Sequence, residues 1–115
     1  MTESYIQATQ MMSESVVKSE GTTTSELRQS IEIYTAALSA HSAQADAIAA
    51  TLPTELLTYL KKIALYAYKV TDKDIEALRS AGYSEDALFE ITVSGALGAG
   101  MTRLQHGLQA LKGEA

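Results

Sequence analysis

Three side chains in the last third of the chain are of the types that acid–base chemistry on a small organic acid requires. Glu90 lies between Phe89 and Ile91, an apolar setting of the kind that raises a carboxyl pKa and suits the group to proton transfer. Arg103 and His106 are three residues apart and therefore share one face of a helix. Together they predict a catalytic set in which Glu90 or His106 moves a proton while Arg103 holds a substrate carboxylate.

A structural role is the alternative for these residues, and residue type alone favours it. Arg103 would then form an ion pair on a helix surface, and Glu90 would be solvated or would cap a helix.

Tyr66 and Tyr68, together with Tyr59, crowd one predicted helix. Tyrosines at this density predict a pocket for a small apolar molecule, although a helix-bundle core explains them at least as well. His41 falls on an apolar stripe, where a hydrogen-bonded interface histidine is commoner than a metal ligand. Because the two histidines lack the spacing of a metal-binding helix, no metal site is expected. No cofactor is expected either.

Gly95, Gly98 and Gly100 resemble a nucleotide-binding loop only at first sight. That fingerprint has the order G-x-G-x-x-G after a strand, whereas this chain has G-x-x-G-x-G inside a helical pattern. The glycines instead predict a smooth strip on which a neighbouring helix lies close. Each glycine costs about 1 kcal/mol of helix propensity, which close packing must offset.

The apolar spacing predicts five helices, each with recognisable ends. The first covers residues 3–19, and the second runs from a cap at Thr24 or Ser25 to the break at Leu52-Pro53. A third follows Pro53, a short fourth begins at Thr71 and ends at Gly82, and Ser84 caps the last. The second helix carries a heptad stripe that needs a long partner, in the same chain or in a second copy: Leu27, Ile31, Tyr34, Leu38, His41, Ala45, Ile48 and Leu52.

Length and composition predict one all-α domain over residues 1–115 and exclude several functions. The net charge is −5 and the basic residues are scattered, which argues against nucleic-acid binding. The absence of cysteine removes disulfides and thiolate chemistry. No apolar run reaches the ~20 residues of a membrane span, and the N-terminus has no leader pattern, so a cytoplasmic protein without membrane contact is expected.

Residues 70–111, VTDKDIEALRSAGYSEDALFEITVSGALGAGMTRLQHGLQAL, resemble the carboxymuconolactone decarboxylase and alkylhydroperoxidase-D-like (AhpD-like) family. The similarity lies in a helix ending in A/L-x-x-x-G, the turn YSEDALFEI and a small-residue helix with the Arg of TRL. With the preceding helix, the family-like core covers residues 53–112, and residues 1–20 are peripheral.

The resemblance implies a five-helix bundle whose long helices form the interface of a dimer, trimer or hexamer. Redox members carry C-x-x-C-x-x-x-H before the glycine. Anchored on Gly82, the cysteine positions hold Ala67 and Val70 and the histidine position holds Asp74. A thiol peroxidase mechanism is therefore excluded in its usual form.

Three functions follow as hypotheses. The first is a non-redox, homo-oligomeric AhpD-like protein with a binding or accessory role toward a small apolar molecule or a protein. The second is a cofactor-independent decarboxylase- or isomerase-like enzyme that uses Glu90 or His106 for proton transfer. The third is a protein interaction module that docks through its long second helix.

Overall fold

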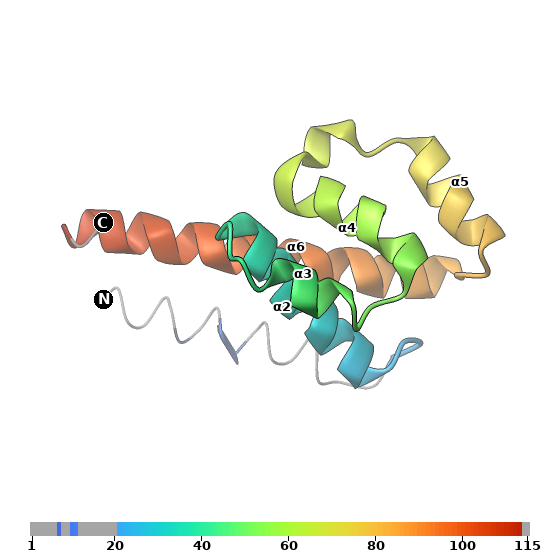
Figure 1. Cartoon of the computed structure of the whole chain (residues 1–115), viewed down its shortest axis with the longest axis horizontal. Coiled ribbons are helices and arrows are strands. Elements are labelled where there is room, and N and C mark those ends of the chain that lie inside the picture. Colours follow the sequence, from blue (N-terminus) through green and yellow to red (C-terminus); the bar gives the residue numbers. More distant parts are fainter. Residues whose placement is uncertain (1–6, 8–9, 12–20, 114–115) are drawn as a thin grey trace.

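The computed structural model describes residues 7, 10, 11 and 21–113, and this part of the chain is helical, without strands (Figure 1). The all-α prediction is therefore confirmed. The helix expected over residues 3–19 lies outside the described residues except for Gln7, Gln10 and Met11, which are helical. The described elements are the helices α2 (Ser25–Ser39), α3 (Ala45–Ala49), α4 (Thr54–Leu65), α5 (Asp72–Ser80) and α6 (Glu85–Leu111) and the 3-10 turn η1 (Ala67–Lys69).

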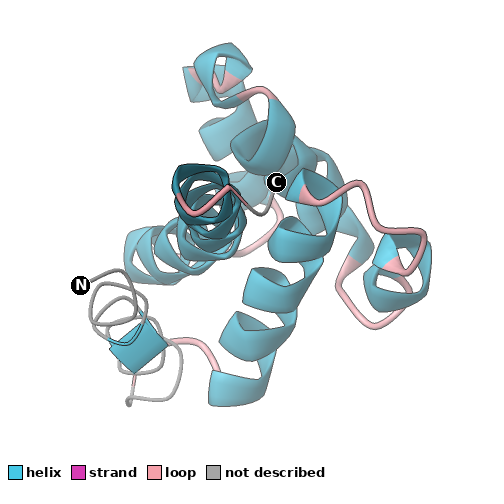
Figure 2. Cartoon of the chain, turned by 90° about the vertical axis from the view of Figure 1, so that its left-hand side faces the viewer, coloured by secondary structure: helices cyan, strands magenta, loops and turns pink. Residues whose placement is uncertain are grey.

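Helix α6 is the axis of the molecule. Its 27 residues correspond to a length of about 40 Å. Figure 1 shows α6 running along the longest axis, with its C-terminal turns extending beyond the other labelled helices. Figure 2, which looks along α6 from that end, shows the remaining helices arranged around it. The N-terminal part of α6 therefore lies among the other helices, whereas its C-terminal turns lie beyond them.

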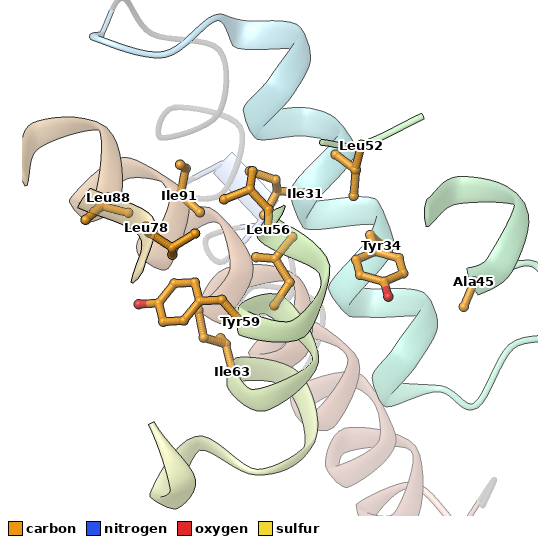
Figure 3. Close-up of a cluster of buried hydrophobic side chains, with 11 residues drawn as sticks. Ile31, Tyr34, Ala45, Leu52, Leu56, Tyr59, Ile63, Leu78, Leu88 and Ile91 are labelled. Atoms are coloured by element: carbon orange, nitrogen blue, oxygen red, sulfur yellow. The ribbon is translucent and has the colours of Figure 1, made fainter. Parts of the chain in front are cut away.

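The core lies where α2, α4 and α6 meet. Figure 3 shows Ile31, Leu56 and Ile91, one from each helix, pointing toward one another, and all three are fully buried. The heptad stripe forms one wall of this core, since Ile31 and Tyr34 are at most 1% exposed and Ala45 and Leu52 are also buried. Four residues of the stripe therefore pack into the chain's own core, whereas Leu27, Leu38 and Ile48 are partly buried and His41 is exposed.

The prediction of one helix from residue 25 to residue 52 is wrong. Helix α2 ends at Ser39, and the chain turns before α3 begins at Ala45. The turn is a Schellman motif, in which the His41 N–H donates to the Leu38 carbonyl (3.1 Å) and the Ser42 N–H to the Ala37 carbonyl (2.9 Å). His41 occupies the left-handed position with φ 54°. Apolar spacing continues across the turn because α3 folds back onto the same core.

The helix ends predicted from polar residues are confirmed. Thr24 accepts the Leu27 N–H at 3.1 Å, and Ser84 accepts the Ala87 N–H at 3.1 Å. The Asp74 carboxylate accepts the Thr71 N–H at 2.8 Å at the start of α5. Gly82, with φ 106°, ends the same helix in the left-handed conformation.

The glycine strip is confirmed at two of its three positions. A Cβ on Gly98 would lie 2.1 Å from the Glu32 carbonyl oxygen of α2, and one on Gly95 would lie 3.3 Å from Leu60 of α4. Gly100 has open space on its Cβ side. The strip therefore consists of Gly95 and Gly98, and it allows α2 to approach the backbone of α6.

Candidate functional site

Glu90 lies in the second turn of α6 and anchors the segment that precedes α2. Its Oε2 accepts the Thr22 N–H at 2.7 Å, and its Oε1 accepts the Thr23 N–H at 2.8 Å and the Thr23 hydroxyl at 2.6 Å. The guanidinium of buried Arg28 adds a weaker ion pair at 3.8 Å. Both carboxylate oxygens are engaged by the protein.

These contacts lower the pKa of Glu90 to about 2, from an ordinary value of 4.5. The largest cause is the Thr23 hydroxyl, followed by the Thr23 N–H, since donors stabilise the ionised carboxylate. The expectation of a raised pKa is wrong, because the apolar neighbours Phe89 and Ile91 lie beside Glu90 in the sequence but do not surround its carboxylate. A carboxylate that stays ionised at neutral pH is not a proton donor.

The structure does not bring Glu90 together with the other two predicted catalytic residues. Arg103 is 13 residues further along α6, which corresponds to about 20 Å of helix. His106 is one turn beyond Arg103 and is exposed. An arrangement of the three residues around one enclosed pocket is therefore not formed.

Arg103 reaches the C-terminal end of α4, where its Nη2 donates to the Ala64 carbonyl oxygen. The Ser39 hydroxyl, from the end of α2, donates to the same carbonyl at 3.5 Å. The last carbonyls of a helix have no partner within it, so Arg103 satisfies one of them and complements the negative end of the helix dipole. Arg103 thereby links α6 to the C-terminal end of α4.

A surface pocket of about 320 Å³ opens at this junction. Its lining combines a guanidinium, an imidazole, a phenol ring and a hydroxyl with apolar atoms, contributed by Ser39, His41, Ala64, Leu65, Tyr66 and Arg103. The chain reaches this arrangement because α2 ends at the His41 turn and α4 ends where Tyr66 leaves the helical conformation (φ −142°, ψ 53°). We call it the Arg103 pocket.

The two tyrosines predicted to line a ligand pocket are placed differently. Tyr66 lines the Arg103 pocket and is 46% exposed, whereas Tyr68 is 80% exposed. Their rings form an edge-to-face pair with centroids 6.5 Å apart, and the Lys69 Nζ lies 4.8 Å from the Tyr66 centroid. Helix α4 ends at Leu65, before both tyrosines, and Tyr68 lies exposed in η1.

The charges around the pocket favour an anion. The C-terminal ends of α2 and α4 contribute roughly half a negative charge each. Arg103 in the lining and Lys69 beside Tyr66 contribute one positive charge each. Among the residues that line the pocket, none is acidic and Arg103 is cationic.

Sequence reasoning missed His41 as a pocket residue, because its place in the heptad stripe suggested an interface position. The signal that marks it is the segment Ser39-Ala40-His41-Ser42, small and polar residues around a residue type that tolerates the left-handed conformation better than most.

Within residues 7, 10, 11 and 21–113, no helix is long and apolar enough to cross a membrane. The same residues contain no group of three His, Cys, Asp or Glu side chains placed to hold a metal ion. Comparison of the chain with protein-family models, with curated proteins and with solved structures gives no match.

Proposed function

We propose that this protein is a cysteine-free, AhpD-like helical binding protein that holds a small aromatic carboxylate in the Arg103 pocket. The observation that carries the proposal is the convergence of Arg103 with the Tyr66 ring in one hollow of about 320 Å³. Binding pockets begin at about 300 Å³, so this volume fits a small ligand.

Arg103 supplies the recognition of the anion. A guanidinium has five N–H donors in a planar fork that matches a carboxylate, and one Nη2 donor is used on Ala64. A carboxylate bound by the remaining donors would form charge-assisted hydrogen bonds. Tyr66, about half exposed, offers ring surface for the apolar body of the ligand.

The enzymatic alternative finds less support in this geometry. It assigned proton transfer to Glu90 or His106, and neither residue lines the Arg103 pocket. Glu90 is also held by the donors of Thr22 and Thr23, and its lowered pKa makes it a weak proton acceptor as well as an ionised group with no proton to donate. A binding role needs neither residue.

The test is a titration followed by two-dimensional NMR of the backbone amides. We expect benzoate to bind with a Kd on the order of 1 mM, the range open to a ligand of its size, and to shift the amides around Ala64, Tyr66 and Arg103. Benzamide has nearly the same shape without the charge and serves as the matched control. Equal affinity for the two compounds, or shifts confined to another region, would contradict the proposal.

Self-association, which the resemblance implies, is a second candidate property. The observation that favours it is a set of large apolar side chains outside the core, among which Ile33 is 57% exposed, Phe89 70% and Leu111 83%. Light scattering at micromolar concentration should give a mass above that of one chain. A monomeric mass would contradict it.

A further inference from the structure

Three described helices end with a residue in the left-handed conformation, and one of these residues is not glycine. Gly82 follows α5 with φ 106° and Gly113 follows α6 with φ 77°, whereas His41 follows α2 with φ 54°. Side chains with a Cβ are disfavoured in this conformation, which is why glycine is the usual choice.

The turns at His41 and Gly82 are equivalent in their hydrogen bonds. The Gly82 N–H donates to Arg79 at 3.0 Å and the Tyr83 N–H to Leu78 at 3.1 Å, matching the pair of bonds around His41. Glycine at position 41 would therefore form the same turn with less backbone strain than histidine does. The fold gives no reason for an imidazole at this position.

The pocket gives a reason. His41 lines the Arg103 pocket together with Tyr66, on the side formed by the end of α2. We propose that His41 is a ligand-binding residue of this pocket, held in an unfavourable backbone conformation because its imidazole contacts the bound carboxylate compound. The inference rests on the proposed function. It adds that the histidine makes the fold less stable than a glycine at this turn would, and that it is present because it binds the ligand. Backbone outliers of this kind concentrate at functional sites.

The experiment compares stability and benzoate binding in the same set of variants. His41→Gly should raise Tm by roughly 2–6 °C, since glycine relieves the backbone strain, and should weaken benzoate binding at least about 5-fold. His41→Asn also accepts the left-handed conformation and lacks an imidazole, so its Tm should be no lower than that of the wild type, and it should lose the same affinity.

Gly82→His is the matched control, because it places a histidine at the equivalent turn of α5, where a Cβ meets nothing within 4 Å. It should lower Tm by a similar amount and leave benzoate binding unchanged.

The possible failures are distinct. Wild-type protein that does not bind benzoate overturns the proposed function and this inference with it. Wild-type protein that binds benzoate while His41→Gly or His41→Asn binds equally well overturns the role of His41 alone.

Discussion

Gly98 of α6 lies against the main chain of Glu32 in α2, so closely that a Cβ on Gly98 would stand 2.1 Å from the Glu32 carbonyl oxygen. The contact partner is backbone, which cannot rotate away as a side chain can. The spacing of α2 and α6 therefore depends on the absence of a side chain at this position.

Gly98→Ala should destabilise the protein by about 1–3 kcal/mol, the usual cost of overpacking, even though alanine is the better helix former. Gly100→Ala, two residues along the same helix and with open space on its Cβ side, should instead add up to about 1 kcal/mol. Urea unfolding followed by circular dichroism measures both changes. Equal effects of the two substitutions would show that α2 does not approach α6 as described.

The Glu90 carboxylate should make stability depend on acid pH. Its pKa is about 2 in the folded chain and 4.5 ordinarily, so it stabilises the fold above about pH 4.5 and loses this contribution as pH falls through about 2. Glu90→Gln should therefore lower Tm by several degrees at pH 7, and the difference from wild type should shrink between pH 4.5 and pH 2.

Glu76→Gln is the control for that series. Glu76 is 68% exposed and pairs with Arg79 on the surface of α5 at 3.6 Å, a kind of ion pair that contributes little. A Glu90→Gln protein whose Tm follows that of Glu76→Gln at every pH would refute the anchoring role of Glu90.

Tyr83 should make stability depend on alkaline pH. Burial, and then the hydrogen bond from its hydroxyl to Glu55 at 2.7 Å, raise the pKa of Tyr83 to about 12 from an ordinary 10. Because the folded chain holds this proton more tightly, the stabilisation is complete below about pH 10 and is lost as pH rises through about 12. Tyr83→Phe should reduce the loss of Tm over this range, whereas Tyr68→Phe, at a residue 80% exposed, should leave it unchanged.

Features set by short stretches of sequence could be predicted, and features set by distant partners could not. Local residues determine the helix caps at Thr24 and Ser84 and the left-handed turn at Gly82. The types of these residues are therefore enough to predict the helix ends. The sequence around Glu90 predicts an apolar environment, whereas the partners that lower its pKa, Thr22 and Thr23, are 68 and 67 residues away in the chain.

The pocket was only partly predictable for the same reason. The residue types of Arg103 and Tyr66 mark them as candidate binding residues. The ends of α2 and α4, which bring them into one pocket, cannot be read from the sequence pattern. The end of α2 at Ser39 has neither the glycine nor the proline that usually marks one, and the heptad spacing continues through it. His41 therefore looked like part of a helix interface, although it lies at a turn beside the pocket.

The contribution of the Arg103 guanidinium to carboxylate binding is the most direct measurement of function. Isothermal titration of wild type and Arg103→Gln with benzoate and benzamide separates the charge from the shape of the ligand, and thermal unfolding confirms that the variant is folded. We expect Arg103→Gln to weaken benzoate binding by about 10-fold or more, which corresponds to roughly 1.4 kcal/mol, and to leave benzamide binding unchanged. Benzoate affinity that is the same in wild type and Arg103→Gln would contradict carboxylate binding in this pocket.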